Sequence, residues 1–432
     1  MSEWREIKLA DLIARGVAEI RTGPFGTQLR ASDYSSEGVP VINVRNLGYG
    51  TVRTAEIERV GFDVQERLRG HLLAQGDVVF GRKGAVDRHI LVTQKEAGWM
   101  QGSDCIRMRL LEGSPISPAF LSKTLLTPSH KAWMEAQASH GATMASLNQA
   151  IIGRISVSVP ELPRQRRIAA VLAAFDELIE INERRIELLE DLARSLYREW
   201  FVRFRFPGHE AVEFVDSQLG RVPSGWPVKP TREVLNPIGG GTPSKKRSDF
   251  WEGGQIDWFT PSDLTKAETR YLAESQSRIT ALGLANSSAR LFPAGSVLMT
   301  SRATLGVLGI AATEASCNQG FIVIPPVAGM PAEFIFEWLA TQDGALESIA
   351  TGATFKEITK TAFARFPFLL PPREVLARFE EAIVPIGRQL GLFEETIRAL
   401  ATTRDLLLPR LVTGRVDIDD IDLAELLRPE AA

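Results

Sequence analysis

Cysteine and histidine are scarce in this chain, and long apolar runs are missing. Two cysteines, Cys105 and Cys317, among 432 residues cannot form a disulfide framework, and this usage is typical of a reducing cytoplasm, where we expect the protein to work. The five histidines form no cluster with the spacing of metal ligands. No run of about 18 apolar residues predicts a membrane span, and the first residues lack the pattern of a signal peptide.

Signatures of the common enzyme classes are also missing. GGGTPSKK at 239–246 lacks the spacing of a phosphate-binding loop, and neither a GxSxG elbow nor an HExxH motif occurs. Amino-methyltransferases carry an Asn/Asp-Pro-Pro-aromatic motif, and the nearest strings, Asn236-Pro237-Ile238 and Leu370-Pro371-Pro372, do not match it. We therefore expect this chain to have no catalytic residues, no metal and no cofactor of its own.

The charge balance does not by itself indicate a nucleic-acid binder. The formal net charge is −3, whereas stand-alone nucleic-acid-binding domains are usually basic. Residues 1–160 are weakly positive, the stretches 161–205 and 372–414 are neutral, and the tail 415–432 is acidic. If the protein binds DNA, it must gather basic groups on one face or obtain them from partners.

What the chain does contain is a long heptad pattern, present twice. From Ile168 to Trp200, apolar residues recur in steps of four and three, the a/d pattern of a seam between two helices. The pattern returns from Phe379 to Leu411, each position lying 211 residues after its counterpart. The predicted helix seam consists of Ile168, Leu172, Phe175, Ile179, Asn182, Ile186, Leu189, Leu196, Trp200, Phe379, Ile383, Ile386, Leu390, Phe393, Ile397, Leu400, Leu407 and Leu411.

The segments outside the helices repeat as well. GPFGTQLRASDY (23–34) corresponds to GGGTPSKKRSDF (239–250), GDVVFGRKGA (76–85) to GSVLMTSRAT (295–304), and 141–160 to 352–371. An internal duplication with a period near 211 residues is the simplest account. The alignment pairs Gly23 with Gly239, Arg45-Asn46 with Ser262-Asp263, and Arg82-Lys83 with Arg302-Ala303.

The predicted fold class is α+β, with two similar α+β domains separated by two long antiparallel helices of the coiled-coil type. Duplicated halves tend to pack about a pseudo-two-fold axis, which makes the helices antiparallel. The helix from 168 to 200 alone rises about 50 Å. The predicted boundaries are 1–160 for the first domain, 161–205 for the first long helix, 206–225 for a linker, 226–371 for the second domain, 372–414 for the second long helix and 415–432 for an acidic tail.

Four stretches carry a family resemblance. They are SVPELPRQRRIAAVLAAFDELIEINERRIELLEDLARSLYREWFVRFRFPGHE (158–210), DSQLGRVPSGW (216–226), GGGTPSKKRSDFWEGGQIDWFTPSDL (239–264) and LLLPRLVTGR (406–415). Together with the layout of the whole chain, they resemble the specificity subunit of type I restriction–modification systems.

The resemblance implies a non-catalytic, DNA-binding subunit. Each target-recognition domain is then expected to bind one half of a split, asymmetric double-stranded DNA target, and the helices to set the spacing between the halves. Two methyltransferase subunits and the restriction (translocase–nuclease) subunits are the implied partners, and S-adenosylmethionine, ATP and Mg are expected only on them. The C-terminal end is expected to return to the N-terminus.

Candidate DNA contacts lie in the paired glycine-rich loops. Bases are usually bound by Arg, Lys, Asn or Gln, and phosphates by basic side chains, hydroxyls or backbone N–H groups. The common alternative is a solvated surface charge or, for Asn46 and Asp263, a turn cap. The candidates are Gln28, Arg30, Arg45, Asn46, Arg82 and Lys83 in the first domain and Thr242, Ser244, Lys245, Lys246, Arg247, Ser262 and Arg302 in the second.

Two other functions stay open at this point. The near-neutral domains also fit a protein-binding scaffold with a coiled-coil spacer, and a solitary nuclease or methyltransferase with an unrecognised site is a third reading. Trp200 and Phe201 are expected to pack in the seam or against a partner rather than to stack on bases. Val171 and Leu192, just off the seam, are candidates for exposed contacts with a methyltransferase partner.

Overall fold

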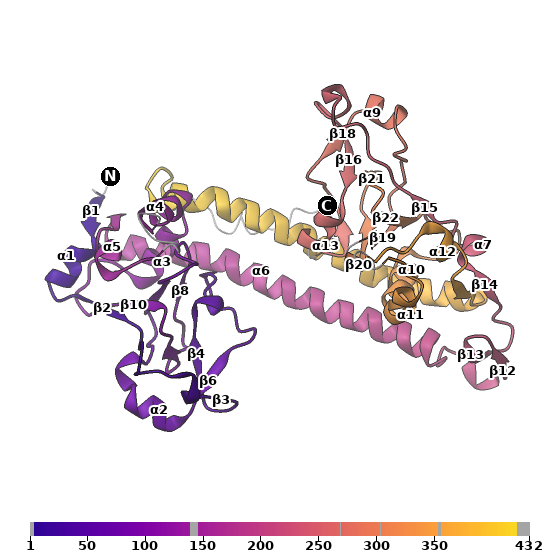
Figure 1. The fold of residues 1–432 in the computed structure, drawn as a ribbon. Helices are drawn as coiled ribbons and strands as arrows, with labels where there is room; N and C mark the ends of the chain where they lie inside the picture. The colour runs from indigo at the N-terminus through magenta and orange to yellow at the C-terminus, as the bar shows by residue number, and fades with distance from the viewer. Residues whose placement is uncertain (1–3, 139–145, 268, 303, 353–355, 421–432) are drawn as a thin grey trace. The chain divides into compact units, whose positions relative to one another are not determined.

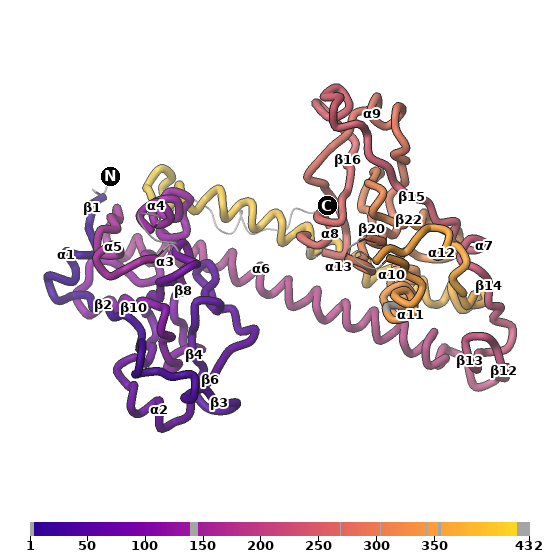
Figure 2. The backbone as a smooth tube through the Cα atoms, in the orientation of Figure 1, coloured from indigo at the N-terminus to yellow at the C-terminus, as the bar shows by residue number. Residues whose placement is uncertain are grey.

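The computed structural model describes residues 4–138, 146–267, 269–302, 304–352 and 356–420 (Figures 1 and 2). By its internal contacts the chain forms two compact units, which are 1–179 together with 399–432, and 180–398. We call them the first unit and the second unit. Each unit therefore combines one of the predicted domains with a part of each long helix.

The first unit is built on a five-stranded sheet with the order β2-β10-β7-β8-β5. Its neighbours are antiparallel except for β5 and β8, which are parallel. A second sheet has the order β3-β6-β4-β9, with β4 and β9 parallel, and β1 pairs with β11. The bounds are β1 Arg5–Lys8, α1 Leu9–Ala14, β2 Ala18–Thr22, η1 Ala31–Asp33, β3 Tyr34–Ser35, β4 Val39–Ile42, η2 Val44–Asn46, β5 Tyr49–Gly50, β6 Glu58–Val60, α2 Phe62–Arg67, η3 Arg69–His71, β7 Val78–Gly81, β8 His89–Leu91, β9 Met100–Gln101, β10 Cys105–Leu110, α3 Pro118–Leu125, α4 Pro128–Ala138, α5 Gln149–Gly153, β11 Ser156–Val159 and η7 Ile418–Asp420.

The second unit has the same plan. Its main sheet has the order β15-β22-β19-β20-β17, again antiparallel except for the parallel pair β17 and β20. A smaller sheet has the order β18-β16-β21, with β16 and β21 parallel, and β14 pairs with β23. The bounds are η5 His209–Ala211, β12 Phe214–Ser217, β13 Gly220–Pro223, β14 Val228–Pro230, α7 Thr231–Val234, β15 Ile238–Gly239, η6 Ser248–Phe250, β16 Ile256–Phe259, α8 Pro261–Ala267, β17 Tyr271–Leu272, β18 Arg278–Ile279, α9 Ala281–Ala285, β19 Val297–Arg302, β20 Thr304–Ala311, β21 Ser316–Cys317, β22 Phe321–Ile324, α10 Ala332–Ala340, α11 Asp343–Ser348, α12 Lys360–Ala364 and β23 Pro367–Leu369.

The matching strand orders and directions confirm the predicted α+β class and the internal repeat. Short β-branched stretches such as VPVI and FIVI form buried strands, as the composition of strands predicts. The predicted linker 206–225 is not featureless, because β12 and β13 form a hairpin within it. No helix in the described part of the chain is long and apolar enough to cross a membrane.

The two heptad stretches form single long helices, α6 (Leu162–Tyr197) and α13 (Arg373–Val412). A π-helical turn, Arg198–Val202, extends α6. In the first unit, Leu172 near the start of α6 shares a core with Leu411 at the end of α13. In the second unit, Tyr197 shares a core with Phe379 near the start of α13.

Within each unit the helices therefore run antiparallel. Every predicted seam residue is buried or half-buried, because the a/d positions of one helix face those of the other. One expectation off the seam is wrong, since Val171 is only 4% exposed and belongs to the core of the first unit. Leu192 is exposed on α6.

The end of α13 closes onto the start of the chain within the first unit, as the family resemblance implies. Arg164 forms an ion pair with Asp417, with 2.6 Å between the charged groups. Ile418 is buried in the same core as α1. A Cβ at Gly414 would overlap the Trp4 ring, so this glycine permits the close approach of Trp4 to the segment that follows α13.

Candidate nucleic-acid interface

Four loops and the turn before α5 meet at one place in the first unit. The N–H of Gly23 donates to the carbonyl of Cys105 at 2.9 Å, and that of Gly102 donates to Ile42 at 2.9 Å. Both backbone polar groups of Arg82 are hydrogen-bonded, since its N–H donates to the carbonyl of Asp104 and its carbonyl accepts from the N–H of Leu147. We call residues 23–30, 43–47, 81–85, 101–105 and 146–149 the first loop cluster.

The second unit has an equivalent assembly. The N–H of Gly241 donates to the carbonyl of Cys317 at 2.9 Å, and that of Asn318 donates to Phe259 at 3.0 Å. The carbonyl of Ser301 accepts from Ile358, and its N–H donates to Gly320. We call residues 240–247, 259–263, 300–302 and 317–320 the second loop cluster. The sequence-predicted DNA candidates all belong to these two clusters.

Strand pairing corrects the predicted alignment of the first glycine. Thr22 lies opposite Ile106 in the first unit, and Gly239 lies opposite Ile322 in the second. Ile106 and Ile322 hold the same place in the two sheets, so Thr22 corresponds to Gly239. The next residues also correspond, which pairs Gly23 with Gly240 and not with Gly239. Both glycines are required by close packing, since a Cβ would overlap the carbonyl oxygen of Gly102 or of Asn318.

The basic loop after β7 needs a similar correction. The isolated bridge between Lys83 and Ser146 corresponds to the one between Arg302 and Glu357. Lys83 is therefore the counterpart of Arg302, and Arg82 is the counterpart of Ser301, which is buried. The two clusters thus differ by a whole guanidinium group at this position.

Asn46 is wrong as a candidate for DNA contact. Its side chain is fully buried, its Oδ1 accepts from the N–H of Asn43 at 3.1 Å, and its Nδ2 donates to the carbonyls of Arg53 and Ala55. Asp263, its counterpart, likewise accepts from the N–H of Thr260 at 2.7 Å. Both are the turn caps that the sequence offered as the alternative.

The exposed basic candidates fall into paired and unpaired groups. Arg45 pairs with Glu58 at 3.0 Å and Arg302 with Glu357 at 2.7 Å. Arg247 holds Asp249 at 2.5 Å, which lowers the pKa of that carboxyl.

Lys245 and Lys246 are exposed, and within the described residues no ion pair involves them. The remaining candidates Gln28, Arg30, Ser244 and Ser262 are exposed, and Thr242 is half-buried, with its hydroxyl donating to Gln319 at 2.6 Å.

Sequence reasoning missed three residues on the first cluster. Phe25 is 61% exposed and lines a cavity of about 400 Å³ together with Arg82, Asn148 and Gln149. The amide of Gln149 donates to the Thr22 hydroxyl at 3.0 Å, which fixes that rim. An aromatic residue flanked by glycines in a polar loop is the signal that could have identified this site.

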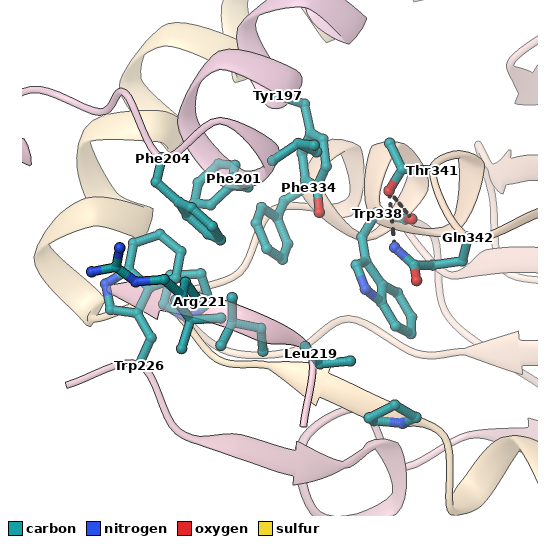
Figure 3. A pocket seen from close by; sticks show the side chains of 15 residues that line it. Tyr197, Phe201, Phe204, Leu219, Arg221, Trp226, Phe334, Trp338, Thr341 and Gln342 are labelled. Carbon is teal, nitrogen blue, oxygen red and sulfur yellow. Dashed lines mark hydrogen bonds between the residues drawn. The ribbon is translucent and has the colours of Figure 1, made fainter. Parts of the chain in front are cut away.

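The aromatic residues at the end of α6 form a different feature. Figure 3 shows Phe201, Trp226 and Phe334 lining a pocket of about 400 Å³ in the second unit. Phe201 is buried, and its ring lies 4.8 Å from that of Phe334 and 4.9 Å from that of Phe379. Phe201 therefore packs within the protein, as expected, and its ring is not presented for base stacking.

Both cysteines are buried, and the described residues show no cluster of metal ligands. Cys105 and Cys317 are free and buried, and burial raises the pKa of both thiols, which keeps them protonated. Among the described residues, no group of three or more His, Cys, Asp or Glu side chains is placed to hold a metal ion.

Comparison with known families identifies this arrangement. The model of the type I restriction modification DNA specificity domain matches residues 1–191 and again 223–388, so it falls once on each half of the duplication. The chain belongs to this family. The family is that of the DNA specificity subunits of type I restriction–modification systems, and the two units contain its target-recognition domains.

Individual relatives agree with the family assignment. The chain is 32% identical over 205 residues to the type I restriction enzyme MjaIX specificity subunit of Methanocaldococcus jannaschii, a match that covers 45% of this chain and 46% of that protein. It is 21% identical to the HindI specificity subunit of Haemophilus influenzae, across 96% of this chain and 100% of the relative. The crystal structure of a type I S subunit from M. genitalium has the same fold, with a TM-score of 0.62 at 13% identity over 95% of this chain and 96% of that one.

Proposed function

We propose that this specificity-family protein binds a bipartite, asymmetric DNA target, with one loop cluster contacting each half. The observation that carries the proposal is the pairing of a common topology with different side chains at equivalent places. Arg82 stands where the second cluster has Ser301, and the exposed Lys245 and Lys246 belong to the second cluster alone. Two binding sites that share a topology but carry different side chains favour a target whose two halves differ in sequence.

Local charge supports DNA as the ligand of both clusters. Arg82 and Lys83 share one carboxylate, Asp104, at 3.9 and 3.7 Å, which leaves an excess of positive charge beside the first cluster. Lys245 and Lys246 supply the same excess in the second. Phosphate contacts of this kind position a protein on duplex DNA, while amides and guanidinium groups nearby can contact bases.

The helix pair is proposed to set the distance between the two half-sites and to dock partner subunits. Each helix contributes residues to both units, so it can transmit a fixed spacing. Exposed apolar residues that share one face of each helix support docking, since contiguous apolar patches mark sites of protein contact. They include Ile181, Leu188 and Leu192 on α6 and Leu392 and Leu406 on α13.

Chemistry is proposed to belong to these partners. Two methyltransferase subunits would bind S-adenosylmethionine and methylate adenine, and restriction subunits would use ATP and Mg. The chain itself would be non-catalytic and act in the cytoplasm by placing the partners on a chosen sequence.

Co-expression with a methyltransferase subunit tests the proposal. The expected complex methylates adenine within a two-part sequence, and sequencing of methylated positions in the host DNA reveals both parts. Methylation of a single continuous sequence, or none with any cognate methyltransferase, contradicts the proposal.

A protein-binding scaffold is the alternative that the near-neutral charge favours. A salt titration of DNA binding by the assembled complex separates the two functions. Affinity should fall steeply with salt if the clusters contact phosphates, because each contact releases counterions. A flat dependence, or no DNA binding, favours the scaffold.

A further inference from the structure

The backbone conformation of the first loop cluster keeps the Phe25 side chain exposed to solvent. Two residues earlier, the N–H of Gly23 donates a hydrogen bond to the carbonyl of Cys105. The Gly23 Cα lies so close to Gly102 that no residue larger than glycine fits at position 23. Gly26, one residue later, has a φ of +63°, which other residues rarely adopt. The turn between these glycines therefore presents the ring outward, where it is 61% exposed.

Exposure alone indicates little, because single exposed apolar residues are common. The surroundings of Phe25 distinguish it. The Arg82 guanidinium lies over the ring at 5.9 Å, and the cavity beside it is lined by the buried Ile106 and by the amide side chains of Asn148 and Gln149. Phe62 is 73% exposed in the same unit but begins α2, outside the first loop cluster.

We propose that Phe25 inserts into one base step of the first half-site and stacks on a base there. Because base steps differ in how easily they unstack, this contact makes Phe25 a specificity-determining residue of the protein. A flat apolar ring, flanked by a guanidinium and by the amides of Asn148 and Gln149, matches a nucleobase, which has an apolar face and a polar edge. The surplus charge of Arg82 and Lys83 over Asp104 lies beside the ring and favours the phosphates of the same nucleotides. This inference rests on the proposed function, because it assumes that the first cluster contacts DNA.

The second cluster lacks an equivalent ring. The corrected pairing of Gly23 with Gly240 makes Thr242 the counterpart of Phe25 in the second unit. The Thr242 hydroxyl donates a hydrogen bond to Gln319 at 2.6 Å. Stacking is therefore confined to one half of the target. This asymmetry gives the experiment an internal reference, since the second half-site should not respond to Phe25.

The test uses the complex with the methyltransferase subunit and a duplex carrying the target mapped from host methylation. Phe25→Ala should weaken binding to that duplex about 5- to 150-fold, the range measured for loss of one base–aromatic stack. The slope of log affinity against log salt should not change, because no phosphate contact is lost, whereas Lys83→Ala should reduce it by about one. Phe25→Trp should retain binding.

Phe62→Ala is the matched control, as it removes a second exposed phenyl ring from the same unit and should leave binding unchanged. Thermal unfolding should be the same for both alanine variants. Wild-type affinity in Phe25→Ala, or an equal loss on a non-specific duplex, overturns the stacking while leaving the proposed function intact. A wild-type complex that binds no DNA overturns the proposed function and the stacking with it.

Discussion

The two units attach to their long helices through ion pairs that are built differently. In the first unit, Lys123 of α3 pairs with Asp176 of α6, and Arg404 of α13 pairs with the same carboxylate at 2.8 Å. In the second unit, α10 carries Glu337 at the position of Lys123, six residues after the N-cap in both helices. Glu337 pairs with Arg270 at 2.8 Å, and Arg270 in turn pairs with Glu190 of α6 at 3.8 Å. A shared topology thus contains two junctions that are not chemically interchangeable.

The junctions also differ in burial. The Lys123 and Asp176 side chains are 15% and 31% exposed, against 3% and 2% for Arg270 and Glu337. The backbone N–H of Arg270 donates to Glu394 at 2.7 Å, and burial raises the pKa of both Glu337 and Glu394. Breaking a buried pair costs more than breaking a partly solvated one, because the remaining charge cannot be hydrated. The second domain is therefore anchored through a more deeply buried ion-pair network than the first.

Removing the buried cation should have the largest effect on stability. Arg270→Met should lower the free energy of unfolding by about 3–5 kcal/mol, the usual cost of leaving a buried charge without its partner. Lys123→Met should cost only about 1–2 kcal/mol. Urea unfolding of both variants measures the two losses.

The double variant Arg270→Met/Glu337→Met is the control for this comparison. It should be more stable than Arg270→Met alone, because no unpaired carboxylate remains at that position. Equal losses for Arg270→Met and Lys123→Met would contradict the contrast between a dry and a solvated junction.

Acid should weaken the first unit selectively. Burial lowers the pKa of His89 to about 4, whereas the unfolded chain binds this proton near pH 6.5. The contribution of neutral His89 to the free energy of unfolding is complete above pH 6.5. It is lost as the pH falls toward 4, by about 3 kcal/mol for this pKa shift. Hydrogen exchange of β8 between pH 6.5 and 4 measures the loss.

His89→Leu is the matched control, because Leu308 occupies the equivalent place on β20. The two residues face Phe80 and Met299 at corresponding positions of the sheets. The variant should flatten the pH dependence of β8 protection, whatever its stability at neutral pH. An unchanged pH dependence would show that another group is responsible.

Two neighbouring glycines should respond differently to alanine. A Cβ at Gly240 would overlap the carbonyl oxygens of Cys317 and Asn318, whereas the nearest atom to a Cβ at Gly239 is Lys360 Cδ at 3.9 Å. Gly240→Ala should therefore destabilise the second unit by about 1–3 kcal/mol, as overpacking does, and Gly239→Ala should have a much smaller effect. The opposite order in thermal unfolding would restore the pairing of Gly23 with Gly239.

The glycine pair illustrates what the sequence can and cannot provide. The heptads gave the long helices, because an a/d pattern depends only on spacing along one chain. The alignment of the loops depends on hydrogen bonds between strands. The difference in residue number between the two copies also varies along the repeat, so the sequence alone could not reveal a one-residue error at Gly239 or Arg302.

Site residues were harder to predict for a related reason. Asn46 has the side-chain chemistry of a base contact, but its burial follows from backbone groups that come into reach only in the folded turn. Phe25 is not apparent from the sequence because charged and amide side chains are the usual base contacts, while its exposure is set by close packing of Gly23 on a loop far along the chain. Residue type therefore indicated the loops correctly but not which side chains face outward.

Replacing residues 1–160 with the corresponding domain of a family member that has another target tests the central claim most directly. The chimaera is co-expressed with the methyltransferase subunit, and methylated adenines are mapped across the host DNA. We predict that one half of the methylated sequence changes while the other half and the spacing stay as in the wild type. A change in both halves, or in neither, would contradict the assignment of one half-site to each unit.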